Sequence, residues 1–424
     1  MGKRIIPVFI LVSLVALSMT TVLSTRAASR TITVPDNYST ISAALRYASS
    51  GDTVYVKKGT YAESTLVISR AVTLMGEDAE STVINNIDNP PWDFSFPPPP
   101  PTVAVQINAD DVKISGFTIT GAVKAVAGKG DGAQITGNIL EANLDLEGNK
   151  LAITGNNLTG NLRCSGAYNN IMGNSMANTG LKGIELEGHS NIVRKNKITG
   201  VIGYGGIYVN SDRNEIAENN ITNSTSGIYI NNGSDNIAYR NRITENAFQV
   251  SAGLILVSGF NNTFYANYIA NNTYGAIIGG AGVDARFSSN TTLYHNSFVG
   301  NSRQVRTDWK IYGSNFWDNG KEGNFWSDYV GNDTNNDGIG DTPYIIDETR
   351  KDNYPLMFPF DIENNTIVRP SPATEPAPTN ETAPTMTQVA VAVAIVASAS
   401  MGLAVYVRKR RLKTEKPNAS TMST

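Results

Sequence analysis

The chain has 424 residues, of which 17% are charged and 38 are glycine, and its formal net charge is −3. This length allows one large domain with appendages, and the abundance of Gly and Asn is typical of strands and turns, not of a helical enzyme. The single cysteine, Cys164, excludes an internal disulfide framework, and we expect it to be a small buried apolar residue.

Residues 1–27 have the pattern of a secretory signal peptide. Lys3 and Arg4 precede an apolar run from Ile5 to Leu17, and small residues follow up to Ala27. The alternative is an N-terminal anchor that is not cleaved.

Residues 28–84 are expected to form an N-terminal cap and the first coils of a repeating fold. The segment from Ser39 to Ala48 predicts a short helix with one apolar face and Ser39 as its N-cap. The apolar face consists of Ile41, Ala44, Leu45 and Ala48. A turn at Gly51 then leads into a strand at residues 53–56.

Residues 85–101 must form a loop, because proline cannot join a central ladder and this segment ends in five prolines. An exposed Trp92 in this loop would suit contact with a glycan or a protein partner. The alternative is a loop that folds back on the coils.

Residues 102–314 repeat three short phrases. The phrase Asn-x-Ile recurs with its isoleucines 23, 22 and 26 residues apart, at Ile198, Ile221, Ile243 and Ile269. A second phrase, Gly-Ile-Tyr, recurs at Gly206 and Gly227. Three strand-like pieces in a period of about 20–25 residues indicate a β-solenoid. We therefore predict an all-β, right-handed parallel β-helix of about nine to eleven coils.

The physical basis of this prediction is that each phrase alternates apolar and polar residues, so that one face points inward. No coil can bury that face alone, but coils stacked at about 4.8 Å bury it continuously. Asn and Gly tolerate positive φ at the corners, and asparagines in register can bond along the stack as a ladder. Asn138, Asn156 and Asn174 are each 18 residues apart and mark one such corner.

Residues 315–362 are expected to cap the far end of the core. Five aromatic residues, Phe316, Trp317, Phe325, Trp326 and Tyr329, are crowded there at a density that can plug a solenoid.

The same region contains the first half of a calcium-loop pattern. Asp333, Asn335 and Asp337 stand at positions 1, 3 and 5, and Asp341 stands at position 9. Position 12 is Tyr344, so an EF-hand is incomplete. This segment could form a calcium site that another carboxylate completes, or an Asx-rich turn without calcium.

The C-terminal part predicts a membrane anchor. Residues 363–386 are a stalk rich in Pro and Thr, and the 21 residues from Thr387 to Val407 contain no charge and are long enough to span a bilayer. The basic tail, residues 408–424, follows directly, so it is expected in the cytoplasm and the rest of the chain outside the cell membrane. The alternative is a buried core helix.

The outside part is acidic. Without the three basic residues of the leader, the six of the tail and the tail's one glutamate, it keeps 25 basic and 36 acidic residues, a net charge near −11. Such a surface repels nucleic acid and discourages polyanions unless a cation bridges.

The chain also resembles known families. The opening TITVPDNYSTISAALRYASSGDTVYVKKGTYAE is similar to the start of pectin-lyase-like β-helices, and NFWSDYVGNDTNNDGIGDTPYIID with DNYPLM resembles the NosD family. The Asn-x-Ile coils between them are similar to carbohydrate-binding and sugar-hydrolase repeats, and the anchor resembles that of archaeal surface proteins. The resemblance covers about residues 31–360. It implies either copper delivery, with which NosD proteins are associated, or the binding or cleavage of polysaccharides.

One outward stripe of side chains is a candidate glycan-binding site. When the coils are aligned, five residues fall in one column at steps of 18, 22, 23 and 21 residues: Asp145, Arg163, Glu185, Tyr208 and Tyr229. Carboxylates, a guanidinium and flat rings are suited to hydroxyl groups and ring faces, and carboxylate pairs also serve hydrolysis. The alternative is a solvated stripe with an ordinary charge ladder and a tyrosine stack.

Copper is not supported by the supply of ligand residues. A copper site needs His, Cys or Met, and the histidines and cysteine of the outside part are only His189, His295 and Cys164, which are far apart in sequence. No Ser-His-Asp set, zinc motif or phosphate loop is visible.

Eleven outside asparagines stand in Asn-x-Ser/Thr sequons, and Asn220, Asn223, Asn232 and Asn271 are candidates for glycosylation. The sequence as a whole predicts a membrane-anchored cell-surface β-helix that binds polysaccharide or envelope partners without catalysis. The alternatives are a polysaccharide-cleaving hydrolase or lyase and a NosD-like copper-delivery factor.

Overall fold

The computed structural model describes residues 28–88, 101–177, 179–247, 251–279, 288–306 and 314–364, which all lie in one compact unit of the chain. The predicted signal peptide, Trp92 and its loop, the span 387–407 and the basic tail lie outside these residues, as does nearly all of the stalk. Within the described ranges, no helix has the length and apolar character needed to cross a membrane.

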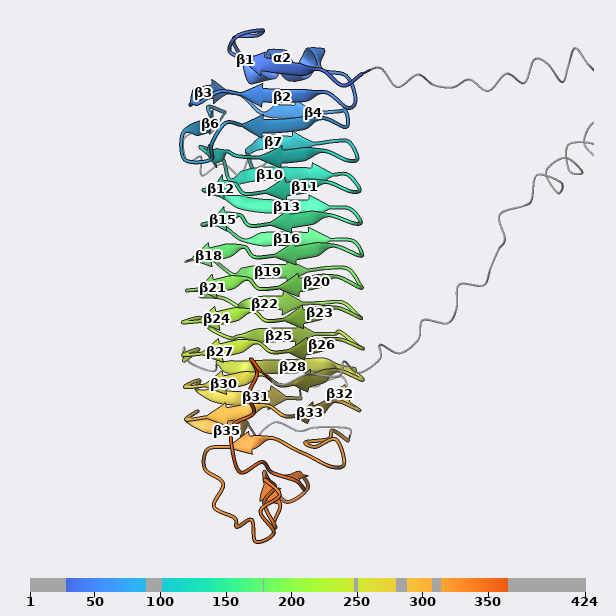
Figure 1. Cartoon of the computed structure of the whole chain (residues 1–424), viewed down its shortest axis with the longest axis vertical. Helices are drawn as coiled ribbons and strands as arrows, with labels where there is room; N and C mark the ends of the chain where they lie inside the picture. The colour runs from blue at the N-terminus through green and yellow to red at the C-terminus, as the bar shows by residue number, and fades with distance from the viewer. Residues whose placement is uncertain are drawn as a thin grey trace, which may run out of the picture. The chain divides into compact units, whose positions relative to one another are not determined.

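Three parallel sheets run the length of this unit, and each coil of the chain adds one strand to each sheet (Figure 1). Apart from the first pair in one sheet, neighbouring strands in these sheets are not consecutive in sequence, so the chain winds around a central axis. One of the three sheets has a ladder of eleven strands, at the upper end of the predicted number of coils. The predicted parallel β-helix is therefore confirmed.

Sheet A consists of β1 (Thr31–Val34), β2 (Thr53–Val56), β5 (Thr73–Gly76), β8 (Lys113–Ser115), β11 (Gln134–Thr136), β14 (Ala152–Thr154), β17 (Asn170–Met172), β20 (Ile192–Arg194), β23 (Glu215–Ala217), β26 (Ile237–Tyr239), β29 (Thr263–Tyr265) and β33 (Thr292–Tyr294). Sheet B consists of β3 (Gly59–Glu63), β6 (Thr82–Asn86), β9 (Thr118–Thr120), β12 (Ile139–Leu140), β15 (Asn157–Leu158), β18 (Ser175–Ala177), β21 (Lys197–Thr199), β24 (Asn220–Thr222), β27 (Arg242–Thr244), β30 (Tyr268–Ala270), β34 (Ser297–Val299) and β36 (Phe325–Trp326).

Sheet C consists of β4 (Leu66–Ile68), β7 (Val103–Ile107), β10 (Lys124–Lys129), β13 (Asn143–Glu147), β16 (Leu162–Ser165), β19 (Lys182–Leu186), β22 (Gly205–Val209), β25 (Ile228–Asn231), β28 (Ala252–Phe260), β31 (Tyr274–Ile278) and β35 (Arg303–Arg306), with β32 (Ser288–Ser289) paired to β28. A short antiparallel pair, β37 (Tyr344–Ile345) and β38 (Lys351–Asp352), lies beyond the last coil.

The register confirms the repeat. Ile198 pairs with Ile221, Ile221 with Ile243 and Ile243 with Ile269, and all four side chains are fully buried. Their neighbours on the same strands alternate to the outside, as the period of two along a strand requires. The inward aliphatic residues of all three sheets form one continuous core.

The glycine of the Gly-Ile-Tyr phrase lies where the isoleucine of the next coil approaches the backbone. A Cβ on Gly206 would lie 2.4 Å from Ile221 Cγ2, and a Cβ on Gly227 would lie 2.2 Å from Ile243 Cγ2 and 2.4 Å from Gly253 O. The missing side chain therefore makes room for the isoleucine ladder.

Replacing Gly227 with alanine is expected to lower the free energy of unfolding by about 2–3 kcal/mol, because the added methyl group overpacks the core against a backbone oxygen. The measurement is urea denaturation followed by circular dichroism. The matched control is Gly180→Ala, since the nearest atom to a Cβ at Gly180 is 3.8 Å away. Equal stability of the two variants would contradict the packing argument.

Buried asparagine ladders run along the three corners between the sheets. In the longest, each side-chain Nδ2 and each backbone N–H donates to the Oδ1 of the asparagine one coil further on, for example Asn219 to Asn241 at 2.9 and 3.0 Å. This ladder consists of Asn138, Asn156, Asn174, Asn196, Asn219, Asn241, Asn267, Asn296 and Asn324. The second consists of Asn169, Asn191, Asn214, Asn236 and Asn262, and the third of Asn246, Asn272 and Asn301. The predicted ladder is confirmed.

The corner conformation differs from the expectation in one respect. Positive φ falls on the residue before each of the first eight asparagines of the longest ladder, not on the asparagine. This position is glycine in the early coils, at Gly137 and Gly155, but Glu218, Arg240 and Ala266 take it later with φ of 56°, 54° and 53°. The ladder asparagine needs an ordinary φ because its side chain points into the core.

The N-terminal end is covered by α2 (Ile41–Tyr47), which buries the predicted apolar face. The N-cap is Thr40, whose side chain accepts a hydrogen bond from Ala43 N, so the expectation of Ser39 is wrong by one residue. The buried carboxylate of Glu63 also accepts from Ile41 N at 2.6 Å, which fixes the helix start on the coil below.

At the other end, stacked aromatic rings close the core as expected. Trp326 lies between Phe298 and Tyr344, with ring centroids 4.5 and 4.4 Å apart, and Trp317 is buried beside it. Phe316 is the exception among the predicted plug residues, because it is 48% exposed.

Candidate functional site

The outer face of sheet C carries the predicted stripe. Asp145 on β13 pairs in register with Arg163 on β16, Arg163 with Glu185 on β19, Glu185 with Tyr208 on β22, and Tyr208 with Tyr229 on β25. Successive strands lie about 4.8 Å apart, so the five side chains form one column, which we call the sheet C column.

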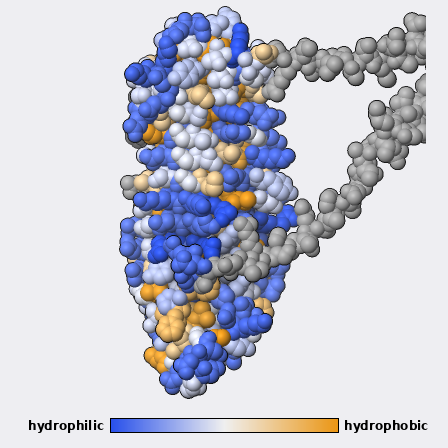
Figure 2. Space-filling model, in the orientation of Figure 1, coloured by the Kyte–Doolittle hydropathy of each residue, from blue (hydrophilic) through white to orange (hydrophobic). Residues whose placement is uncertain are grey.

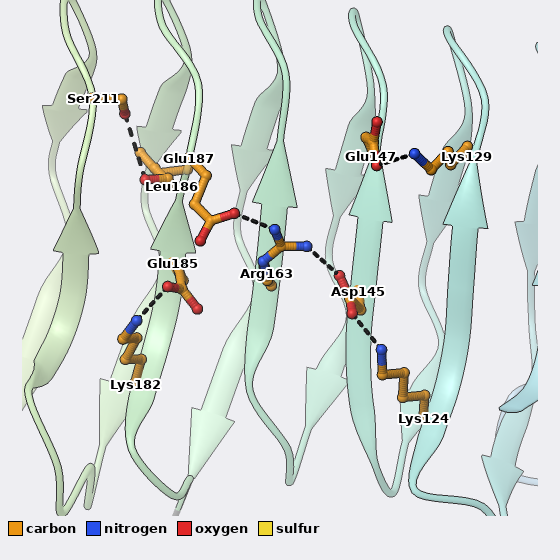
Figure 3. A network of polar contacts seen from close by, with 10 residues as sticks. All are labelled: Lys124, Lys129, Asp145, Glu147, Arg163, Lys182, Glu185, Leu186, Glu187 and Ser211. Carbon is orange, nitrogen blue, oxygen red and sulfur yellow. Dashed lines mark hydrogen bonds and ion pairs between the residues drawn. The ribbon is translucent and has the colours of Figure 1, made fainter. Parts of the chain in front are cut away.

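The charged half of the column is an ion-pair chain (Figure 3). Asp145 accepts from Lys124 at 2.5 Å and from Arg163 at 3.0 Å, and the other end of the Arg163 guanidinium binds Glu187. Burial raises the pKa of the Asp145 carboxyl, but the hydrogen bonds from Lys124 and Arg163 outweigh it and hold the pKa below its usual range. These side chains are partly shielded from solvent. Each of their charges is neutralised by an oppositely charged side chain of a neighbouring coil.

Beyond Glu185 the column becomes aromatic. The rings of Tyr208 and Tyr229 are stacked with centroids 5.3 Å apart, and Tyr204 lies 5.6 Å from Tyr208. Lys182 pairs with Glu185 and places its Nζ 4.1 Å from the centroid of the Tyr208 ring, a cation–π contact. Burial raises the pKa of the Tyr229 hydroxyl, so this phenol remains a hydrogen-bond donor at neutral pH.

The exposed ring of this cluster is not the one expected. Tyr208 points outward but is only 9% exposed, because Lys182 and Tyr204 lie against its ring and Asn231 donates to its hydroxyl at 3.0 Å. Tyr204, which was not predicted, is 52% exposed. Its signal in the sequence is a tyrosine in the corner segment just before the Gly-Ile-Tyr phrase.

The column changes character at both ends. Towards the N-terminus it continues through the small or neutral residues Ala127, Gln106 and Val67. Towards the C-terminus it continues through Ile255 and Ile277, which are buried although they lie on the outward register. Figure 2 shows a mostly hydrophilic surface with scattered apolar spots in this view.

The calcium-loop segment forms a compact turn. The Asp333 carboxylate accepts from Asp337 N and Gly338 N, at 3.2 and 2.9 Å, and Asp341 accepts from Thr334 N at 2.9 Å. Asn335 donates to Asp337 at 2.9 Å. In the parts of the chain that the structure describes, no group of three or more His, Cys, Asp and Glu side chains is arranged to hold a metal ion. Calcium binding here stays a prediction.

The cysteine and the two histidines considered for copper lie on different coils. Cys164 is buried on β16, and burial raises the pKa of its thiol to about 12. His189 contacts the edge of the Tyr168 ring, whereas His295 stacks on Phe360 and pairs with Glu322 at 2.5 Å.

The candidate glycosylation sites lie on the surface to different degrees. Asn223, Asn232 and Asn271 are exposed and take positive φ, while Asn220 is half-buried in β24. Their modification stays a prediction.

Comparison with known proteins agrees with this architecture. Residues 160–328 match the family model described as a right handed beta helix region. A stretch of 97 residues is 34% identical to a probable ABC transporter binding protein NosD from Stutzerimonas stutzeri, and it covers 22% of this chain and 19% of that protein. The chain is thus a right-handed parallel β-helix protein. More particularly, it is NosD-like over part of its length.

Three solved structures are similar to this chain at low sequence identity. The Dettilon tailspike protein is 13% identical with a TM-score of 0.48, covering 68% of each chain. The A-module of mannuronan C-5 epimerase AlgE4 from Azotobacter vinelandii is 14% identical with a TM-score of 0.44, covering 63% of this chain and 86% of that one. A mannuronic acid specific polysaccharide family 6 lyase from human gut microbiota is 14% identical with a TM-score of 0.45, covering 68% of this chain and 80% of that one.

Proposed function

We propose that this protein is a cell-surface carbohydrate-binding β-helix that holds a glycan on the outer face of sheet C without cleaving it. The observation that carries the proposal is the cluster of Tyr204, Tyr208, Tyr229 and Lys182 on that face. The ring faces supply apolar contact, while the ammonium and the phenol hydroxyls supply hydrogen bonds beside it.

The geometry of the cluster leaves one aromatic ring open to a ligand. Tyr204 is the exposed member, and its ring is tilted by 58° and 45° against Tyr208 and Tyr229, so the three rings present surfaces in more than one plane. Lys182 lies between the rings and Glu185, so its position is fixed before a ligand arrives. A rigid platform of this kind loses little conformational entropy on binding.

Binding without cleavage is supported by the state of the carboxylates. Glycoside hydrolysis needs a general acid whose pKa is raised. Asp145 has a lowered pKa between two cations, and Glu185 is paired with Lys182. The rival proposal of a hydrolase or lyase predicts new reducing ends or unsaturated products when the chain is incubated with a panel of polysaccharides.

Replacing Tyr204 with alanine is expected to weaken glycan binding about tenfold, because it removes the exposed ring of the platform. The measurement is a glycan array with the full chain, followed by titration of the best ligand. Tyr168→Ala is the matched control, since Tyr168 is 53% exposed on another part of the surface. An unchanged affinity in Tyr204→Ala, or no glycan bound by the parent protein, would refute the proposed site.

The cell-surface location is part of the proposal and rests on the leader, span and basic tail in the sequence. Proteolysis of intact cells tests it: the β-helix should be accessible from outside and the tail protected. The NosD likeness keeps copper delivery as the rival function, and tight copper binding in a titration of the full chain would favour it.

A further inference from the structure

A second surface feature lies at the N-terminal end of the β-helix, away from the tyrosine cluster. An open recess of about 380 Å³ is formed between α2 and the segment that contains β4. The residues lining it are Ser42, Leu45, Arg46, Thr65, Val67, Ile68, Ser69, Arg70 and Val72. Its volume falls within the range of small-molecule sites in proteins.

The recess contains two guanidinium groups without an acidic partner. Neither Arg46 nor Arg70 forms an ion pair or a side-chain hydrogen bond within the described ranges. Other arginines of the chain do: Arg30 pairs with Asp52, and Arg194 with Glu218. The recess thus brings together two cations that the described residues do not neutralise.

Two carboxylates that accept hydrogen bonds from lining residues of the recess are engaged by neutral donors. Glu63 accepts from Ile41 N and from the Ser42 hydroxyl at 2.6 and 2.7 Å, and it is buried beneath the helix start. Asp88 accepts from Thr65 N at 2.7 Å. Both acids are thus hydrogen-bonded to neutral donors, and neither is paired with Arg46 or Arg70.

The rest of the lining suits an organic body. Leu45 and Val72 are buried and form an apolar floor, and Val67 exposes 49% of its surface at the side. Ser69 adds a hydroxyl at the rim. An apolar wall with a few polar groups is typical of small-ligand sites, and arginine binds oxyanions through paired N–H donors.

We infer that this recess binds a small organic molecule, about the size of one hexose unit, through one oxyanion group held by Arg46 and Arg70. The negative field of the remaining surface disfavours long polyanions, so the site selects a single anionic group next to an uncharged body. The inference stands on the recess alone and does not depend on glycan binding at the tyrosine cluster.

The test is calorimetric titration of the full chain with glucose 6-phosphate, glucose and inorganic phosphate. We expect glucose 6-phosphate to bind at least about tenfold more tightly than either of the others, and its affinity to fall as sodium chloride is raised. Equal affinity for glucose would show that the oxyanion is not recognised. Equal affinity for inorganic phosphate would show that the organic body is not recognised, and either result overturns the inference.

Variants locate the site. The double variant Arg46→Gln and Arg70→Gln should lose at least about tenfold in affinity for glucose 6-phosphate. The matched control is Lys113→Gln with Lys197→Gln, which removes the same charge from exposed positions on β8 and β21. Thermal unfolding of both variants establishes that they are folded. Unchanged affinity in the folded arginine variant refutes the site, whereas Tyr204→Ala should leave this affinity unaltered, so the two proposals fail independently.

Discussion

Replacing Asn241 with alanine is expected to lower the free energy of unfolding by about 4 kcal/mol, a large loss for one uncharged side chain. Asn241 is fully buried, and its Oδ1 accepts from the backbone N–H and the Nδ2 of Asn219. Its own Nδ2 donates to Ile216 O and to Asn267 Oδ1, both at 2.9 Å. Alanine leaves the two donors of Asn219 without an acceptor in a place that has no room for bulk water, and each such group costs about 1–3 kcal/mol.

Urea denaturation of the Asn241→Ala variant and the parent protein checks this value. Asn210→Ala is the control, because Asn210 is exposed and its side chain has no hydrogen bond within the described residues. Coils of a solenoid contact only their neighbours, so hydrogen exchange should show the loss of protection strongest in the coils next to residue 241. A loss below about 1 kcal/mol would mean that the ladder is not a main source of stability.

The repeating coil could be predicted from the sequence because its two signals, the Asn-x-Ile and Gly-Ile-Tyr phrases, each lie within one coil. The Asn-x-Ile spacing specified the register of sheet B, and the pairs from Ile198 to Ile269 follow it. The same spacing placed the sheet C column, from Asp145 to Tyr229, in one line. A shared period is enough for this, since each strand pairs with the equivalent strand of the next coil.

The contacts around the column could not be predicted in the same way. Lys182 is the first residue of β19 and Tyr204 immediately precedes β22, so both lie next to connecting segments of variable length, where the period gives no position for a side chain. The structure places both against Tyr208, which explains why an outward tyrosine is only 9% exposed. The recess with Arg46 and Arg70 could not be predicted either, because its lining comes from a helix and from a strand segment of the next coil.

The longest ladder must also end, and its last acceptor is not an asparagine. Asn324 donates its backbone N–H to Asp352 Oδ2 at 2.7 Å, and the indole N–H of Trp326 donates to the same oxygen at 2.9 Å. The other carboxylate oxygen accepts from Tyr354 N at 3.0 Å. Asp352 therefore joins the asparagine ladder to the aromatic plug, and its acceptor-only carboxylate matches donors that all point toward it.

Asp352 is expected to make stability depend on pH. Burial raises the pKa of its carboxyl to about 6, and the hydrogen bonds from Asn324, Trp326 and Tyr354 offset only part of this rise. The unfolded pKa is 3.8, so between about pH 4 and pH 6 the native state holds a proton that the unfolded state has lost. Stability should fall as the pH rises through this interval, by about 3 kcal/mol in total, and then stay constant above it.

The Asp352→Asn variant isolates this effect, because an amide does not titrate and still offers one oxygen to Asn324 and Trp326. The measurement is the free energy of unfolding of the parent protein minus that of the variant, at pH values from 4 to 7. We expect this difference to fall by about 3 kcal/mol, whereas carboxylates with lowered pKa, such as Asp347, act in the opposite direction at lower pH and cancel in the subtraction. A difference that stays the same from pH 4 to 7 would show that Asp352 is as readily ionised in the folded protein as in the unfolded chain, and that the end of the ladder holds a carboxylate without cost.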